Sequence, residues 1–331
     1  MSPPAPVRPT SGVRSLEVEV RPPSPFRLPR RGGGDGVTRC RDAVISRLLR
    51  PAGEPVVVCA WQRRRGEVAF RASGPCRDDR PLALAIERMR FALGVDEDLS
   101  DFYREFRRDP LIGPAIRRRP WLRPRRRPWP WEALAWAITE QLIESSRAAE
   151  IQRRMVRRWG ASADLAGDPW SGCPAAASAS ARSRDGRPWP LRDVPAAAAL
   201  AARAPAELAA CDLAPARALA LIRCAREVVA KRADLADPAA DCRLRSIPEI
   251  GPWTTQCLGL RGRGDADSLP AGDLAYVKLV GRLAGLNRRA TIPEIEEFFA
   301  PYEPYRGLAG TFAIAHYHAA VQTGPPLRLA S

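Results

Sequence analysis

Residues Leu244-Arg-Ser-Ile-Pro-Glu-Ile-Gly-Pro-Trp-Thr-Thr255 form the stretch of sequence that decides the fold. The pattern predicts that one helix ends near Ser246, that the chain turns sharply, and that a second helix begins with Pro252. Gly251 can take a positive φ and lets another backbone approach closely. Free backbone N–H groups at the start of the second helix can bind an anion such as a DNA phosphate. A plain connection between two helices is the alternative.

The net charge of the chain also points to an anionic partner. The 331 residues include 53 basic and 37 acidic side chains, which gives a net charge of +16. Only Lys231 and Lys278 are lysines, and a codon bias explains the choice of arginine but not the excess of cations. Because a charge this large favours a polyanion, we expect nucleic acid as the partner. Hydrophobic residues make up 45%, which excludes wholesale disorder and fibres.

Several classes of protein are excluded by what the sequence lacks. No stretch approaches the roughly 20 apolar residues of a membrane helix, and the Pro-rich residues 1–12 resemble a flexible tail rather than a signal peptide. The eight cysteines form no Cys-x-x-Cys pair, so we expect reduced thiols in a cytoplasmic protein. His316 and His318, two apart on a helix, face different ways, and we expect no metal site.

Two regions differ in their hydrophobic patterns. Residues 13–95 predict a small antiparallel α+β domain with four strands and one amphipathic helix, at Ser15–Val20, Ala43–Leu49, Pro55–Trp61, Glu67–Ala72 and Leu82–Leu93. Residues 96–325 predict helices alone, at 99–108, 130–142, 146–159, 195–203, 206–210, 214–231, 252–262, 273–285, 292–300 and 306–321. The Ala-, Ser-, Gly- and Pro-rich residues 161–190 predict a long loop.

An aspartate follows the hairpin in a second turn. The segment Leu269-Pro-Ala-Gly-Asp273 ends at the expected start of a helix, 22 positions after Gly251. Asp273 is suited to cap that helix, and the helix dipole stabilises a carboxylate there. Asp265 and Asp267 are the other nearby acids, and we expect both to be solvated.

The hairpin, the Pro-x-x-Asp turn and Trp131-Glu-Ala-Leu-Ala-Trp-Ala-Ile-Thr-Glu-Gln-Leu-Ile143 resemble the helix-hairpin-helix DNA glycosylases, and within them the 3-methyladenine DNA glycosylase II group. The resemblance covers roughly residues 80–325. It implies a mainly α fold of two helical lobes, with the hairpin at about 238–262 and a small N-terminal antiparallel α+β domain. The family hairpin usually has glycine where this chain has Glu249, whose charge should weaken a phosphate contact.

The resemblance implies chemistry at Asp273. In the family, the matching aspartate stabilises positive charge on the sugar and orients the attacking water. Members that also cut the DNA backbone carry a lysine where this chain has Trp253, so the resemblance implies base removal by water alone. No cysteine follows Cys257, so no iron–sulfur cluster and no other cofactor is expected.

The resemblance also assigns a base pocket to Trp253, Cys257 and His318. An electron-rich ring face suits a cationic alkylated purine, although Trp253 could instead be a core residue. Cys257 and His318 stand where aromatic residues are expected, and Tyr317 and Phe312 could substitute for them.

A DNA interface is implied at the end of the helix that begins near Trp131. Leu142 matches the residue that fills the gap left by a flipped base, with an ordinary core leucine as the alternative. The remaining DNA-contacting positions are Gln141, Pro248, Glu249, Ile250, Gly251 and Thr254. Residues 101–130 contain ten arginines and three acids, and could track phosphates or form a solvated linker.

Together these features predict a monofunctional DNA N-glycosylase of base excision repair. It would flip alkylated purines of the 3-methyladenine type out of duplex DNA and hydrolyse the bond to deoxyribose, leaving an abasic site. We expect a cytoplasmic, nucleoid-associated monomer whose partner is duplex DNA containing damaged bases. The alternatives are a non-catalytic DNA-binding protein on the same scaffold and a glycosylase for oxidised or deaminated bases.

Overall fold

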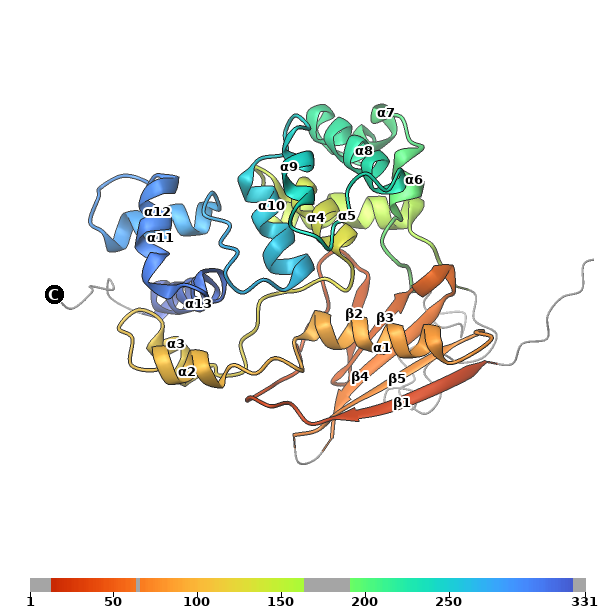
Figure 1. Ribbon diagram of the computed structural model, residues 1–331, viewed down its shortest axis with the longest axis horizontal. Coiled ribbons are helices and arrows are strands. Elements are labelled where there is room, and N and C mark those ends of the chain that lie inside the picture. Colours follow the sequence, from red (N-terminus) through yellow and green to blue (C-terminus); the bar gives the residue numbers. More distant parts are fainter. Residues whose placement is uncertain (1–12, 64–65, 164–190, 324–331) are drawn as a thin grey trace, which may run out of the picture.

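A computed structural model of the chain describes residues 13–63, 66–163 and 191–323. The side chains of residues 318–323 are not described. The predicted tail at 1–12 and most of the predicted loop at 161–190 therefore lie outside the described residues. Figure 1 shows an N-terminal sheet below two groups of helices.

The N-terminal part is a five-stranded antiparallel sheet in the order β1-β5-β4-β3-β2. The strands are β1 (Arg14–Val20), β2 (Thr38–Arg41), β3 (Val44–Leu49), β4 (Val56–Gln62) and β5 (Val68–Gly74). Four of them were predicted. Strand β2 was missed because its four residues carry no period-two pattern, and it exists only by pairing with β3.

Helix α1 (Arg80–Leu93) lies along one face of this sheet (Figure 1). Its apolar residues Leu82, Ile86 and Met89 are buried against the inward side chains of the strands. The spacing of these residues places them on one side of the helix, which is why the amphipathic pattern predicted it. The buried cluster of this part includes Val95, and a separate cluster begins at Leu99. We therefore propose a domain boundary between residues 95 and 96.

The first helical lobe packs around α4 (Pro130–Glu140). It also contains α5 (Ser145–Trp159), α6 (Ala197–Ala201), α7 (Pro205–Ala209), α8 (Pro215–Val229), α9 (Ala240–Arg245) and α10 (Pro252–Leu258). A π-helical turn, Gly259–Arg263, continues α10. Residues 132 to 139 of α4 are all buried, so this helix forms the centre of the lobe.

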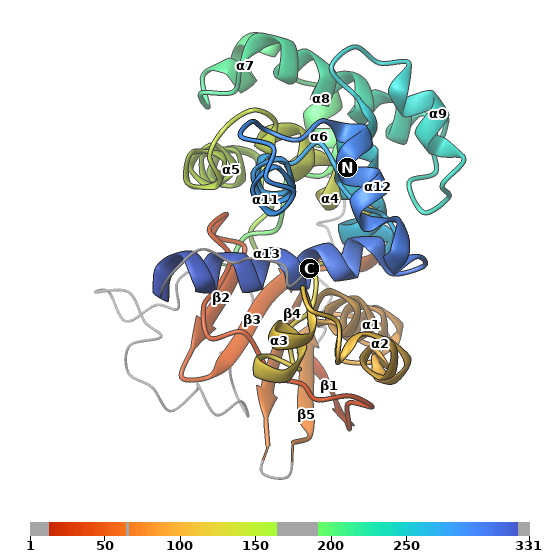
Figure 2. The same ribbon diagram turned by 90° about the vertical axis from the view of Figure 1, so that its left-hand side faces the viewer.

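The second lobe joins segments far apart in the sequence. Helices α2 (Ser100–Phe106) and α3 (Gly113–Arg118) pack with α11 (Leu274–Leu283), α12 (Ile292–Phe299) and α13 (Arg306–Thr323). These helices lie at the left of Figure 1 and face the viewer in Figure 2. Aromatic rings hold it together, with Phe102 and Phe312 centred 5.5 Å apart. Helix α3 was not predicted, because its first residues are glycine and proline.

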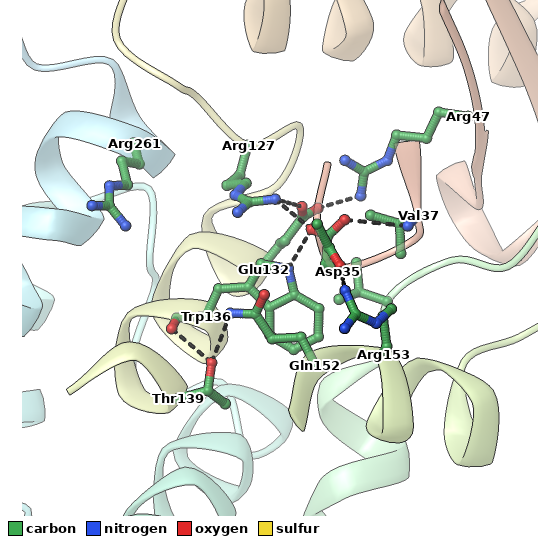
Figure 3. A network of polar contacts seen from close by, with 12 residues as sticks. Asp35, Val37, Arg47, Arg127, Glu132, Trp136, Thr139, Gln152, Arg153 and Arg261 are labelled. Atoms are coloured by element: carbon green, nitrogen blue, oxygen red, sulfur yellow. Dashed lines mark hydrogen bonds and ion pairs between the residues drawn. The ribbon is translucent and has the colours of Figure 1, made fainter. Parts of the chain in front are cut away.

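A buried polar network fixes the sheet to α4 (Figure 3). The Arg47 guanidinium on β3 donates a 2.5 Å hydrogen bond to Glu132, whose side chain is fully buried. Arg127 donates to Asp35 at 2.7 Å and to Glu132 at 3.2 Å, and the indole nitrogen of Trp136 donates to Asp35 at 3.0 Å. These hydrogen bonds therefore fix the N-terminal sheet to α4, the helix whose C-terminal end carries the candidate interface.

Candidate active site

The hairpin between α9 and α10 has its left-handed residue at an unexpected position. Glu249 has φ of 73°, whereas Gly251 is extended with φ of −105° and ψ of −178°. The turn does not use the freedom of Gly251 to take a positive φ, because its left-handed residue lies two positions earlier. A Cβ added at Gly251 would meet no atom of the described residues within 4 Å. The space in front of the hairpin is open.

Gln141 connects this hairpin to the end of α4. Its amide nitrogen donates hydrogen bonds to the Glu249 carbonyl at 2.8 Å and to the Thr254 hydroxyl at 2.9 Å. The backbone carbonyl of Gln141 accepts a 2.7 Å hydrogen bond from Arg217 on α8. Three elements of the first lobe are thus joined at Gln141, whose side-chain nitrogen is used in hydrogen bonds within the protein.

Leu142 is the residue that this connection presents to solvent. It is 97% exposed and has φ of 56°, a left-handed conformation that is strained for leucine. The alternative that Leu142 is a core residue was therefore wrong. An exposed, strained apolar side chain costs free energy in the unbound protein, and such strain collects at functional sites.

Asp273 lies half-buried at the start of α11 and caps that helix. Its Oδ1 accepts a 2.9 Å hydrogen bond from the Ala275 backbone nitrogen. Among the residues that the structure describes, none donates a hydrogen bond to its Oδ2. One oxygen therefore fixes the carboxylate while the other is left for a further partner.

Trp253 lies beside the turn that delivers Asp273. A Cβ added at Gly272 would be 3.5 Å from the Cβ of Trp253 and 3.6 Å from its Cδ1, which is van der Waals contact, so the turn lies against the tryptophan. Trp253 is half-buried, and its indole nitrogen is buried without a hydrogen-bond partner. The structure thus places Trp253 against Gly272, the residue before Asp273.

The other predicted pocket residues are either buried or have side chains outside the described residues. Cys257 is fully buried, and burial raises the pKa of its thiol to about 12, with Asp273 acting in the same direction. It can form only the floor of a pocket. His318 is on α13, but its side chain is outside the described residues. Phe312 is fully buried in the aromatic core, so the expectation that it could line the pocket was wrong.

The competing acids have other partners. Asp265 is exposed and accepts a 2.7 Å hydrogen bond from Ser268. Asp267 pairs with Arg306 at the start of α13, and this hydrogen-bonded pair holds the pKa of Asp267 below its usual value. The expectation that Asp267 is solvated was wrong, because its carboxylate anchors the last helix.

The arginine-rich segment divides into two parts. Arg123 and Arg126 both pair with Glu97, and Arg127 belongs to the buried network of Figure 3. These three therefore neither track phosphates nor form a solvated linker. Residues 117–119 are exposed and stay available to an anion.

The described residues contain no group of three histidine, cysteine or acidic side chains placed to hold a metal ion. The cysteines in this part of the chain are free thiols. No helix of the described residues has the length and apolarity needed to cross a membrane.

Sequence analysis did not find Arg217, Glu140 or Arg261, which surround the end of α4. Glu140 accepts a 2.5 Å hydrogen bond from Arg261 in the π-helical turn. Arg261 lies four positions after Cys257, so the spacing of one helical turn could have indicated it. Nothing in the sequence pattern indicates Arg217, which reaches Gln141 only through the packing of α8 on α4.

Comparison with solved structures decides the fold. A 3-methyladenine DNA glycosylase from Archaeoglobus fulgidus superposes with a TM-score of 0.72 at 18% identity, over 92% of this chain and 99% of that one. A Clostridium acetobutylicum 8-oxoguanine glycosylase/lyase gives a TM-score of 0.64 at 14% identity, over 91% and 97% of the two chains. The chain has the helix-hairpin-helix DNA glycosylase fold. The predicted fold class, with two helical lobes and a small N-terminal antiparallel sheet, is confirmed.

Curated relatives of this glycosylase-fold protein are DNA repair proteins. The DNA-3-methyladenine glycosylase of Bacillus subtilis is 24% identical over 221 residues, which are 65% of this chain and 66% of the relative. A probable bifunctional transcriptional activator/DNA repair enzyme AlkA of Mycobacterium tuberculosis is 36% identical over 69 residues, 20% of this chain. That match spans only 13% of the AlkA protein. No family model matches the chain.

Proposed function

We propose that this chain is a monofunctional DNA N-glycosylase that excises alkylated purines of the 3-methyladenine type from duplex DNA and leaves an abasic site. The observation that carries the proposal is the placement of Trp253 against the turn of Asp273, with one oxygen of that carboxylate free of partners among the described residues. The names of the relatives from Archaeoglobus and Bacillus favour alkylated purines.

Binding begins at the hairpin and at Leu142 in this proposal. The open space before Gly251 receives a phosphate at the first backbone N–H groups of α10. Leu142 enters the base stack and recovers part of the stacking lost when the damaged nucleotide is flipped. The predicted contacts of Pro248, Ile250 and Thr254 stay proposals. The partner is duplex DNA, and a solved complex of the Clostridium protein contains double-stranded DNA. The site of action would be the nucleoid.

In the proposed reaction, Asp273 acts through the negative charge of its carboxylate. As the bond between C1′ and the base nitrogen breaks, its electron pair leaves with the base and positive charge develops on the sugar. The Asp273 carboxylate stabilises that charge and orients a water molecule, whose oxygen bonds to C1′ while its proton passes to the carboxylate and from there to solvent. Trp253 occupies the position of the lysine in bifunctional relatives, and Lys231 and Lys278 are exposed elsewhere. The route therefore has no Schiff base.

A glycosylase for oxidised or deaminated bases is the second candidate. Complete burial of Cys257, where the family resemblance leads one to expect an aromatic ring, reduces the cation-binding surface of the pocket. The fold is also shared with an 8-oxoguanine glycosylase/lyase.

The test measures base release from two sets of duplexes, one methylated and one carrying 8-oxoguanine, hypoxanthine or uracil. Asp273→Asn should lower the rate on the order of 100- to 1,000-fold, because a preorganised charge is lost. Asparagine caps helices about as well as aspartate, so α11 should remain. The control Asp265→Asn should keep full activity. Full activity of Asp273→Asn would refute the assignment, and tight DNA binding without release of any base would favour a non-catalytic binding protein.

A further inference from the structure

The exposed leucine after α4 lies between two residues that the first lobe holds in place. Gln141, before it, is bonded through its side chain to the Glu249 carbonyl and the Thr254 hydroxyl. Ile143, after it, is half-buried and packs on the core of the lobe. Leu142 itself is almost fully exposed and has φ of 56°. Its conformation is therefore imposed by its neighbours and not by contacts of its own side chain.

An arginine from α8 holds the peptide unit that leads into Leu142. The Nη1 atom of Arg217 donates a 2.7 Å hydrogen bond to the backbone carbonyl of Gln141 and a longer one, of 3.5 Å, to that of Thr139. The Gln141 carbonyl and the Leu142 nitrogen belong to the same planar peptide unit. Fixing the carbonyl therefore fixes the plane from which the φ of Leu142 is defined. A leucine that is not held would relax to a negative φ, since the left-handed conformation is unfavourable for a residue with a Cβ.

The position of Arg217 suits it to this task. Its side chain is half-buried, and among the residues that the structure describes it forms no ion pair with a carboxylate. A guanidinium beside the last carbonyls of a helix also interacts favourably with the helix dipole. The hydrogen bonds of Arg217 within the described residues therefore go to the backbone at the end of α4.

Other groups hold the last turn of α4 from different sides. The buried Gln152 on α5 donates a 2.9 Å hydrogen bond from its amide nitrogen to the Thr139 hydroxyl, as Figure 3 shows. Arg261 in the π-helical turn donates a hydrogen bond to the Glu140 carboxylate. These contacts fix the helix, but of the groups named here only Arg217 binds the peptide unit that adjoins Leu142.

We propose that Arg217 is a positioning residue for the wedge, and that it holds the peptide unit between Gln141 and Leu142 so that the leucine is exposed and left-handed before DNA binds. This inference rests on the proposed function of Leu142, which is to fill the gap left by a flipped nucleotide. A preformed wedge removes the cost of ordering this segment during binding. Without Arg217, only a fraction of the unbound molecules presents Leu142, and the apparent affinity for gapped DNA falls by that fraction.

The test measures binding to two duplexes of one sequence, one intact and one with a tetrahydrofuran abasic-site analogue, which presents the gap without any reaction. The dissociation constant for the intact duplex divided by that for the analogue gives the preference for the gap. Arg217→Met removes the hydrogen bond but keeps a long side chain, and should lower this preference about 5- to 10-fold. Arg217→Lys should recover part of the preference, because an ammonium group can donate to the same carbonyl.

A comparison of double variants separates positioning from a direct contact of Arg217 with DNA. In the Leu142→Ala background, Arg217→Met should have little further effect on the preference, because the wedge on which it acts is gone. The matched control is Arg226→Met, which removes a 3.2 Å hydrogen bond from another guanidinium of α8 to the Ala201 carbonyl. This control should leave the preference unchanged. A loss of folded protein weakens binding to both duplexes equally and does not change their ratio.

Several outcomes would overturn the positioning role of Arg217. They are a wild-type preference in Arg217→Met, an equal loss of preference in both backgrounds, and an equal weakening of binding to both duplexes. If the wild type prefers the analogue but releases no base, the proposed hydrolysis is refuted, while a lower preference in Arg217→Met still supports the positioning role. A wild type with no preference for the gap would refute the wedge and this inference with it.

Discussion

At the N-terminal end of helix α4 the carboxylate of Glu132 is fully buried and bonded to two arginines, whereas two residues beyond its C-terminal end Leu142 is 97% exposed. In the first region the charges are paired with one another, but they have been removed from water, which costs free energy. The second region keeps an apolar side chain in water and a backbone in a strained conformation. One rigid helix joins the two. Because the buried ion pairs of Glu132 fix α4 in place, the helix cannot move to relieve the strain at Leu142.

The largest effect should come from substitution of Glu132, at the buried N-terminal end of α4. Glu132→Gln leaves Arg47 and Arg127 without their shared partner in a buried place, and the free energy of unfolding should fall by about 3–5 kcal/mol. Urea unfolding at pH 7 measures it. Glu150→Gln, which changes an exposed carboxylate on α5, should cost less than about 1 kcal/mol. Equal losses in the two variants would remove the distinction between the two ends of α4.

At the strained end, substitution should affect DNA processing and not stability. Leu142→Ala should lower base excision about 10- to 100-fold, because less stacking is recovered after base flipping. The free energy of unfolding should change little, since the side chain buries nothing in the unbound protein. Val229→Ala alters another exposed apolar residue, at the end of α8, and should leave excision unchanged. An unaffected Leu142→Ala would show that Leu142 is not a wedge.

The dependence of stability on pH tests the burial of Asp193, which lies beside Arg47 in the network at the N-terminal end of α4. Burial, with Glu132 nearby, raises the pKa of Asp193 to about 6, although Arg47 opposes it. A raised pKa in the folded state means that the carboxyl favours folding below its ordinary value of 3.8, and that this contribution is lost as the pH rises through about 6. The stability of the wild type relative to Asp193→Asn should therefore fall between pH 4 and pH 7, by on the order of 1–2 kcal/mol. A flat difference over this range would contradict a buried, titrating Asp193.

The smallest effect is expected in the hairpin. Glu249→Gly relieves a left-handed conformation that costs a residue with a Cβ about 1 kcal/mol, so the protein should become more stable by up to that amount. Removal of the carboxylate should also strengthen DNA binding at low salt. Glu249→Gln isolates the charge, since it should strengthen binding without stabilising the fold. If neither variant binds DNA more tightly, no phosphate lies near this side chain.

Local pattern determined much of the fold. Strands β1, β3, β4 and β5 and helix α1 follow from period-two and amphipathic patterns, because each buries one face against its neighbours. Strand β2 and helix α3 could not be predicted, since both are short and depend on their partners. The hairpin was located correctly from Pro248 to Pro252, but local pattern did not show that its left-handed residue is Glu249 and not the glycine.

The sequence by itself determined the residue types of the candidate site: a carboxylate at a helix start, a tryptophan in place of lysine, and a leucine after a polar helix end. Spacing along a helix carries such information because neighbours one turn apart share a face. Only tertiary packing brings about the exposure of Leu142, the burial of Arg127 and the pairing of Glu140 with Arg261. These facts depend on contacts between segments more than 90 residues apart. Chain order does not encode such contacts locally, because they form only when the lobes pack.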